Sequence, residues 1–276
     1  GIMSGSGSLA KTGAGTLTLS GANTYSGGTF INGGALSVGA DSSLGNASGS
    51  LTFGGCTLQT TGSFSTNRSV VLNAGGGTID TFGNSLTLNG SITGGGSLTK
   101  AGSGTLELTG TSTYSGGTTV SAGILQGSSS SLQGDILNNS QVLFAQAADG
   151  TYSGIMSGSG SLAKTGAGTL TLSGANTYSG GTFINGGALS VGADSSLGNA
   201  SGSLTFGGGA LQATGSFSTN RTVVLNAGGG TIDIAGGNTL GLGGSITGGG
   251  SLAKTGTGTL TLSGLNTYSG GTTVWG

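Results

Sequence analysis

The phrase SLAKTGAGTLTLSGANTYSGGT begins at Ser8 and recurs unchanged at Ser161. Two further copies with a few changed letters begin at Ser97 and Ser251. A phrase repeated in this way is typical of solenoids, in which each repeat buries its apolar side against the next one. Successive starts lie about 89, 64 and 90 residues apart, which corresponds to about four, three and four turns of about 21 residues each.

A larger duplication surrounds the phrase. Residues 1–55 reappear as residues 154–208, and the similarity continues to the end of the chain with one residue inserted near Gly237. We therefore expect residues 1–276 to form a single continuous β-helix fragment built of two long repeats, 1–153 and 154–276.

Apolar and small polar residues alternate within each unit of the phrase. Leu17 and Leu19 flank Thr18, and Leu36 and Val38 flank Ser37. A period of two predicts strands. The strings SGAN, SGG and NGG lie between these runs, and glycine there allows the positive φ angles of tight corners. Three short strands and three corners would complete one turn.

The spacing of these runs predicts an all-β fold, a parallel β-helix of about 20–22 residues per coil. The expected neighbours, each pair separated by one coil, are Leu17 and Leu36, Leu9 and Thr29, and Leu72 and Ile92. Each strand would bond to its equivalents about 4.8 Å away, with alternate aliphatic side chains inside and their polar neighbours in water. A sandwich needs antiparallel pairs, commonly joined by two-residue turns, whereas these runs recur in one order and direction.

Composition excludes several other classes. The chain has 67 Gly in 276 residues, 33% hydrophobic residues, 5% charged residues and no proline, which is unlike helical, disordered or collagen-like sequences. The net charge of −1 makes nucleic acid an unexpected partner. No apolar run approaches the roughly 20 residues of a membrane-spanning helix, and no signal segment opens the chain, so we expect an interior fragment of a longer, soluble chain. Cys56 is the single cysteine and its counterpart is Gly209, so neither a disulfide framework nor a thiolate metal site is expected.

The phrase and its surroundings, residues 5–39, resemble the passenger-associated repeat of bacterial autotransporters, and DGTYSGIM at residues 149–156 resembles the segment that often leads into it. The copy at residues 111–113 departs from the pattern, with TST in place of ANT, and the chain ends TTVWG where the pattern would continue. The resemblance implies a right-handed β-helical passenger domain exported to the surface of a Gram-negative bacterium, commonly an adhesin. Its partners would be surface molecules of host cells or neighbouring bacteria, and it would meet the membrane only through a translocator barrel outside this sequence.

The ionisable residues predict no catalytic, cofactor-binding or metal site. Most recur in both long repeats, as Asp41 does at Asp194, so we expect solvated charges of turns and strands. The acids are Asp41, Asp80, Glu107, Asp135, Asp149, Asp194 and Asp233, and the bases are Lys11, Arg68, Lys100, Lys164, Arg221 and Lys254. A polysaccharide-cleaving enzyme needs such groups gathered at one place.

Other motifs favour structure over ligand binding. The strings GAGT and GGGS lack the Lys-Ser/Thr ending of a phosphate loop, and residues 73–80, NAGGGTID, hold one Asp where calcium-binding nonapeptides need one in each repeat. Thr16 and Thr18 would suggest an ice-binding face if threonines lined consecutive coils. The T-L-T phrase recurs only three or four coils apart, so ordinary outward-facing strand threonines are favoured. The tyrosines share one repeat position and are expected to brace a corner; they are Tyr25, Tyr114, Tyr178 and Tyr268.

The hypothesis that these observations favour is a non-enzymatic, surface-displayed stalk or adhesin that serves cell adhesion or aggregation. One alternative is a polysaccharide-active β-helix enzyme that uses Asp80 and Asp233. Another is a purely structural fibre that self-associates, because the open ends of a solenoid expose unpaired strand edges.

Overall fold

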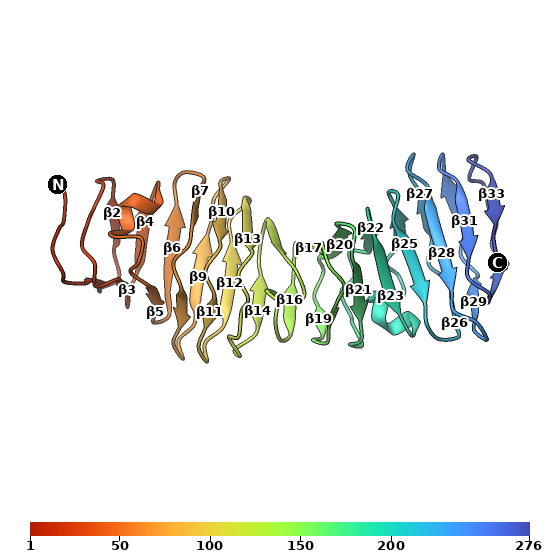
Figure 1. Ribbon diagram of the computed structural model, residues 1–276, viewed down its shortest axis with the longest axis horizontal. Coiled ribbons are helices and arrows are strands. Elements are labelled where there is room, and N and C mark those ends of the chain that lie inside the picture. The colour runs from red at the N-terminus through yellow and green to blue at the C-terminus, as the bar shows by residue number, and fades with distance from the viewer. The chain divides into compact units, whose positions relative to one another are not determined.

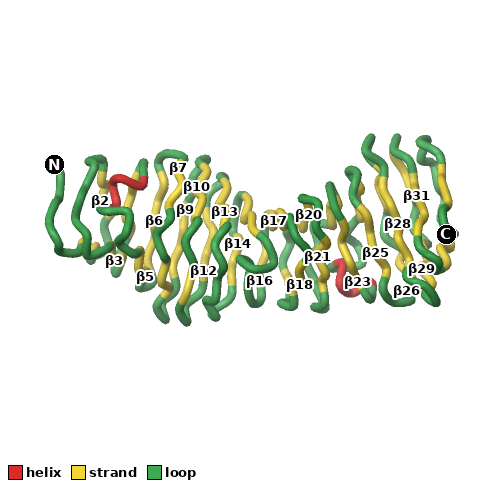
Figure 2. Tube along the Cα trace, viewed as in Figure 1, coloured by secondary structure: helices red, strands yellow, loops and turns green.

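The computed structural model describes residues 1–276 as two compact units, Gly1–Ser140 (unit 1) and Gln141–Gly276 (unit 2). Both consist of short parallel strands stacked as β-solenoid coils, with almost no helix. Figure 1 shows the strands of each unit stacked as successive coils, and Figure 2 shows how loops separate the strands within each coil. The predicted fold class is confirmed.

Unit 1 contains three series of hydrogen-bonded strands. The first series is β1 (Leu9–Lys11), β3 (Thr29–Ile31), β5 (Leu51–Phe53), β8 (Val70–Leu72) and β11 (Ile92–Thr93). The second is β2 (Thr16–Leu19), β4 (Ala35–Val38), β6 (Cys56–Thr60), β9 (Gly77–Asp80), β12 (Leu98–Ala101), β14 (Thr118–Val120) and β16 (Ile136–Asn138). The third is β7 (Phe64–Thr66), β10 (Ser85–Leu88), β13 (Thr105–Leu108) and β15 (Ile124–Gly127). A short 3₁₀ helix, η1 (Asp41–Leu44), follows β4.

Unit 2 repeats this plan. One series is β17 (Gln141–Ala145), β20 (Ser161–Thr165), β22 (Thr182–Ile184), β24 (Leu204–Phe206), β27 (Val223–Leu225) and β30 (Ile246–Gly248). Another is β18 (Gly150–Tyr152), β21 (Thr169–Leu172), β23 (Ala188–Val191), β25 (Ala210–Ala213), β28 (Gly230–Ile234), β31 (Leu252–Thr255) and β33 (Thr272–Val274). The remaining strands are β26 (Phe217–Thr219), β29 (Thr239–Leu242), β32 (Thr259–Leu262) and the two-residue β19 (Met156–Ser157), and the 3₁₀ helix η2 (Asp194–Leu197) matches η1.

The register confirms two of the three predicted neighbour pairs. Leu17 lies beside Leu36, and Leu9 lies beside Thr29. The prediction for Ile92 was wrong by two residues, because its neighbour is Val70. A two-residue shift leaves the same side of the strand facing inward, so the error does not alter the core.

Coils differ in length. The chain from Thr119 to its neighbour Leu137 is shorter than the chain from Val223 to its neighbour Ile246. Both pairs nevertheless belong to parallel strand pairs in which the residues lie in register. The differences are therefore taken up by the corners.

Aliphatic side chains from alternate strand positions fill the interior. Leu36, Leu58 and Ile79 lie in register on consecutive coils and are at most 1% exposed. Burying such a side chain contributes roughly 1.5–3 kcal/mol.

The corners depend on glycine where coils approach closely. Gly34 has a φ of 59°, and a Cβ there would lie 2.3 Å from the carbonyl oxygen of Gly15 in the preceding coil. Only glycine fits such a position. No helix in the structure has the length and apolar character needed to cross a bilayer.

Candidate functional site

The lysine of the repeated phrase is buried at a corner. Lys11, 6% exposed, donates three hydrogen bonds of 2.8 Å from Nζ, to the carbonyl oxygens of Thr12, Gly13 and Gly33. The ammonium group has three donors and no acceptor, so these carbonyls satisfy it completely. Because Gly33 belongs to the following coil, the charge joins two coils.

The same arrangement recurs at the other copies of the phrase. Lys100 donates to the carbonyl oxygens of Ala101, Gly102 and Ala122, and Lys164 donates to those of Thr165, Gly166 and Gly186. Lys254 bonds to the carbonyl oxygens of Thr255 and Gly256. The repeated lysine is therefore a structural crosslink of the corner.

Burial shifts the proton equilibrium of these lysines. Removal of water lowers the pKa of Lys100 to about 8, and the nearby carboxylate of Asp80 acts in the opposite direction. Burial also lowers the pKa of Lys164, again opposed by a carboxylate, that of Asp149. Desolvation disfavours the charged form of a lysine in this way.

These shifts predict that stability rises with pH between about 8 and 10. In that interval the unfolded chain, with lysine pKa values near 10.4, binds more protons than the folded chain, so the free energy of unfolding increases with pH. Above pH 10 the sign reverses, because burial raises the pKa of Tyr178 to about 12 and also raises those of Tyr25 and Tyr114. The unfolded chain then loses protons first.

Melting curves from pH 7 to 11 test this prediction. We expect the melting temperature to pass through a maximum near pH 10, and Lys100→Met to flatten the rise below it. A melting temperature that falls steadily from pH 8 would contradict the lysine assignment.

The tyrosine of the phrase closes a different corner, the one between β2 and β3. The hydroxyl of Tyr25 lies 2.7 Å from Thr29 Oγ1, and Tyr178 lies 2.6 Å from Thr182 Oγ1. Tyr114 with Thr118 and Tyr268 with Thr272 make the same pair. The prediction that these tyrosines brace a corner is confirmed.

The asparagine of the ANT segment links three successive coils. Asn23 Oδ1 accepts the amide hydrogen of Met3 at 2.8 Å, and its Nδ2 donates to the carbonyl oxygen of Ser43 at 2.8 Å. Asn176 makes the matching bonds to Met156 and Ser196, both of 2.7 Å. One side chain therefore satisfies a backbone donor on one side and a backbone acceptor on the other.

The TST copy of the phrase lacks this link. Ser112 stands at the asparagine position, and its Oγ is a buried atom with no hydrogen-bond partner. A buried hydroxyl without a partner costs roughly 1–3 kcal/mol. The sequence departure noted above is therefore a weak point of unit 1.

Replacing Ser112 by Asn is expected to stabilise unit 1 by about 1 kcal/mol. The new amide would reach the positions that correspond to the partners of Asn23, namely the Ile92 amide and the Ser131 carbonyl. Urea unfolding measures the change. Ser112→Ala is the control, since it removes the hydroxyl without building the link, and a Ser112→Asn protein less stable than this control would contradict the assignment.

A buried arginine holds the loop that contains each 3₁₀ helix. Arg68, 2% exposed, bonds through Nε to Asp41 Oδ1 at 2.7 Å. Its Nη atoms donate to the carbonyl oxygens of Gly45, Asn46 and Gly49 at 2.7, 2.6 and 3.0 Å. In unit 2 Arg221 and Asp194 repeat the ion pair at 2.8 Å. We call each set the arginine clamp.

Breaking one clamp is expected to destabilise its unit by about 3 kcal/mol, because removal of one partner leaves a buried group uncompensated. Arg221→Ala would remove the guanidinium donor from the Asp194 carboxylate and from four backbone carbonyl oxygens, those of Asp194, Gly198, Asn199 and Gly202. Urea unfolding and hydrogen exchange of residues 194–203 measure the effect. Arg221→Lys keeps the charge but lacks the planar guanidinium group, so this variant should also be less stable than the native protein. Equal stability of Arg221→Lys and the native protein would contradict the importance of the clamp geometry.

The expectation of solvated charges is wrong for the bases. The six basic residues are all at most 7% exposed; they are Lys11, Arg68, Lys100, Lys164, Arg221 and Lys254. Strand alternation explains this, because Lys11 lies two residues after Leu9, and both side chains point toward the same side of β1. The two-residue spacing from an inward-facing neighbour is the sequence signal that predicts burial of these bases.

The acids remain on the outer side. Asp135 and Asp149 are exposed, whereas Asp80, Glu107 and Asp233 are half-buried. Glu107 accepts hydrogen bonds from Thr87 and Gln126 on the neighbouring coils. The outer surface of each unit therefore carries carboxylates without exposed cations.

Asp80 and Asp233, the candidates for an enzymatic role, make structural hydrogen bonds, Asp80 at a corner and Asp233 to the neighbouring strand. Asp80 Oδ1 accepts the amide hydrogen of Phe82 at 3.0 Å, and Asp233 Oδ1 accepts the hydroxyl of Thr255 at 3.0 Å. The structure contains no group of three or more His, Cys, Asp or Glu residues that could hold a metal ion. That the chain has no catalytic, cofactor or metal site stays a prediction.

Threonines do line consecutive coils in unit 1, contrary to the spacing argument. Thr57, Thr78, Thr99 and Thr119 lie in register and are half-buried on the outer side. We call them the threonine column. The adjacent outward positions are Gln59, Asp80 and Ala101, so the regular two-dimensional array of an ice-binding face is not formed.

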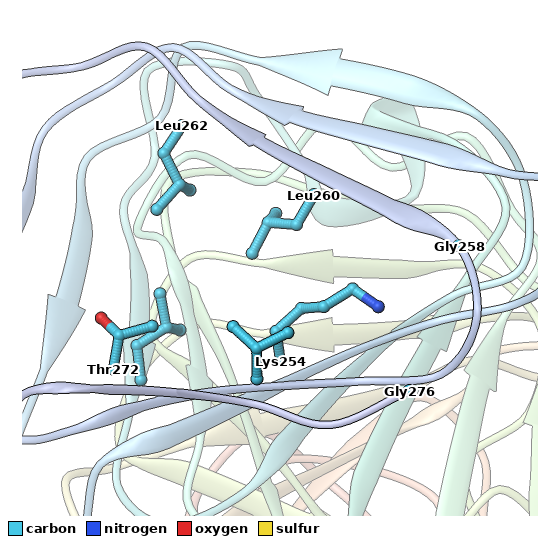
Figure 3. A pocket seen from close by; sticks show the side chains of 8 residues that line it. Lys254, Gly258, Leu260, Leu262, Thr272 and Gly276 are labelled. Carbon is cyan, nitrogen blue, oxygen red and sulfur yellow. The ribbon is translucent and has the colours of Figure 1, made fainter.

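Two pockets in unit 2 also lack acid–base chemistry. Figure 3 shows the first, about 320 Å³, where aliphatic side chains such as Leu260 and Leu262 surround Lys254, whose amine already bonds to two carbonyls. The second, about 380 Å³, is lined by small and hydroxyl side chains beside η2, including Thr171, Ser195 and Thr214. Neither contains a carboxylate.

Comparison with known proteins shows that the segments with these lysine and tyrosine corners match a known repeat family. The model of the passenger-associated-transport-repeat matches residues 9–38, 98–126, 162–191 and 252–276, which contain the four lysine and tyrosine corners. The Adhesin BmaC autotransporter of Brucella suis biovar 1 (strain 1330) is 44% identical over 205 residues. The match covers 72% of this chain and 6% of that relative, and no solved structure matches.

The matched segments and the relative agree with the resemblance based on the phrase. The corner residues are shared by all four copies, and the solenoid provides the coils that such repeats require. The chain is a passenger segment of the bacterial autotransporter family, built on passenger-associated-transport repeats.

Proposed function

We propose that this segment is a non-enzymatic stalk and contact surface of an adhesin displayed on the cell. As an autotransporter passenger it belongs at the surface of a Gram-negative bacterium after export through the outer membrane. The observation that carries the proposal is the use of the ionisable groups: lysines, arginines and tyrosines hold corners and loops together. The name of the relative, an adhesin, supports the same function.

Contact would occur through the outward side chains. They are mostly hydroxyl and small aliphatic groups, as in the threonine column. Such surfaces bind through hydrogen bonds and van der Waals contact spread over many coils, with little electrostatic steering. We infer that the partners are surface molecules of host cells or of neighbouring bacteria.

Adhesion of bacteria that display the full passenger tests the proposal. Deletion of residues 1–276 is expected to reduce adhesion or clumping. A second variant, Thr57→Lys with Thr99→Lys, changes the outer face while the inward side chains stay in place. If this variant and the deletion both adhere like the native strain, the contact function is refuted; if only the deletion loses adhesion, the segment serves as a spacer.

Absence of enzymatic activity is part of the same proposal. Incubation with a panel of polysaccharides is expected to give no turnover. Turnover that disappears in the Asp80→Asn, Asp233→Asn double variant would favour the polysaccharide-active alternative, and this variant keeps hydrogen-bond acceptors at both positions.

A further inference from the structure

We propose that Asn46 and Asn199 are acceptor sites for N-linked sugars. Each begins an Asn-Ala-Ser triplet, and Asn-X-Ser/Thr is the sequence in which an asparagine amide is glycosylated. The chain contains six such triplets, which begin at Asn46, Asn67, Asn89, Asn138, Asn199 and Asn220. The structure distinguishes the two Asn-Ala-Ser triplets from the other four.

The backbone of the acceptor residue is fixed by the corner beneath it. The Asn46 amide donates to the carbonyl oxygen of Tyr25 at 2.8 Å, and its carbonyl oxygen accepts from Gly49 at 2.9 Å and from the clamp residue Arg68 at 2.6 Å. The loop therefore presents Asn46 in one conformation. Asn199 has the same partners in unit 2, namely Tyr178, Gly202 and Arg221.

The side chain points outward with its nitrogen available. Asn46 Oδ1 accepts the amide hydrogen of Ser48 at 3.0 Å and the Ser48 hydroxyl at 2.9 Å. A backbone N–H can only donate, so the atom that faces it must be the amide oxygen, and Nδ2 faces the solvent. Asn199 and Ser201 make the same two contacts at 3.0 and 2.8 Å, and both asparagines are exposed.

The other four triplets lack this arrangement. Asn138 is 0% exposed, and the Nδ2 of Asn89 donates to Asn67 Oδ1 at 2.9 Å. Asn67 and Asn220 precede the buried clamp arginines in the short segments between strands, and no hydrogen bond joins either one to the hydroxyl residue of its triplet. Only Asn46 and Asn199 combine exposure, a fixed backbone and the contact between amide and hydroxyl.

The co-substrate would be a sugar activated by a pyrophosphate ester at its anomeric carbon. The asparagine nitrogen forms a bond to that carbon, and the bond from carbon to the phosphate oxygen breaks. The pyrophosphate-containing group leaves with the electron pair, and one Nδ2 proton passes to a base of the transferase. A nucleotide sugar and a lipid-linked sugar share this chemistry.

The test uses the folded chain with two purified bacterial transferases. One arm supplies UDP-glucose and a transferase that uses nucleotide sugars, and the other supplies a lipid-linked oligosaccharide and its oligosaccharyltransferase. Intact mass and peptide mapping are expected to show transfer at Asn46 and Asn199 at least about tenfold faster than at the other triplets, because Asn138 for example becomes accessible only by local opening. A reference peptide verifies that each enzyme is active.

Variants distinguish the effect of the triplet hydroxyl on transfer from an effect on folding. Ser48→Ala and Ser201→Ala are expected to abolish transfer at the adjacent asparagine, whereas Ser48→Thr restores it and Ser69→Ala has no effect. Circular dichroism checks that each variant is folded. Absence of transfer in both arms, transfer to the urea-unfolded chain alone, or equal rates at Asn67 and Asn220 would overturn the proposal.

Discussion

Trypsin is expected to leave the folded chain intact. This protease cleaves after lysine and arginine, and the six residues of these types are at most 7% exposed. Their charged groups bond to backbone carbonyl oxygens of the corners and loops, so cleavage requires a coil to open. Because proteolysis of this kind follows the population of the open form, we expect cleavage on the order of a thousandfold slower than in the unfolded chain.

A single exposed lysine provides the control. Ala200 is an exposed residue of the loop after η2, and Ala200→Lys is expected to create one fast cleavage site there. Combining it with Arg221→Ala, which frees the loop, should accelerate the cut further. Rapid cleavage of the native chain at Lys100 or Lys164 would show that these corners open readily, and would contradict their role as crosslinks.

The fold can be predicted from the short-range alternation of apolar and polar residues. Leu17 and Leu19 alternate with threonine, and the return of this pattern one coil later predicted the neighbour Leu36 correctly. The pattern could not fix the neighbour of Ile92, because alternation is unchanged by a shift of two residues. Corner length decides the register there, and a Gly-rich corner tolerates extra residues without leaving a signal in the strands.

Burial of the bases follows from their strand positions, whereas their charge alone favours exposure to solvent. Lys11 continues the inward series that Leu9 begins, and Arg68 lies midway between Thr66 and Val70, which are both buried. Alternation alone therefore predicts that both side chains point inward. The partners of Arg68 could not be predicted, since Asp41 and the carbonyls of Gly45 and Gly49 come from an irregular loop one coil earlier.

Burial of these charges explains how a glycine-rich solenoid holds its corners. A corner cannot continue the strand ladder, so several carbonyl groups would lack donors inside the coil. One ammonium group supplies three donors, and one guanidinium group supplies five. The repeat therefore places its scarce cations where backbone acceptors gather, and the outer surface is left to hydroxyl groups and carboxylates.

Removing half of the protein is expected to be less damaging than removing one strand residue. In a solenoid each coil contacts its neighbours, and stability is approximately a sum of coil and interface terms. The fragment Gln141–Gly276 forms a compact unit with its own core. We therefore expect it to keep its β-sheet circular dichroism and to unfold cooperatively without residues 1–140.

Deletion of Thr171 alone should unfold the coil that contains it. Leu170 and Leu172 both point inward and are at most 1% exposed, and the deletion would make them adjacent, so that one must turn outward. Exposing a leucine and burying Ser173 in its place together cost about 3–5 kcal/mol. The chain cannot slide to recover its register, because Asn176 is bonded to coils on both sides.

Deletion of Gly249 is the matched control for the loss of one residue. It lies at an exposed corner where an added Cβ would meet nothing within 4 Å, and the unequal lengths of the coils show that corners absorb such changes. Circular dichroism and urea unfolding of the three deletions decide the matter. If the fragment lost its β signal, or if deletion of Thr171 were as harmless as deletion of Gly249, stability would not be the sum of independently registered coils.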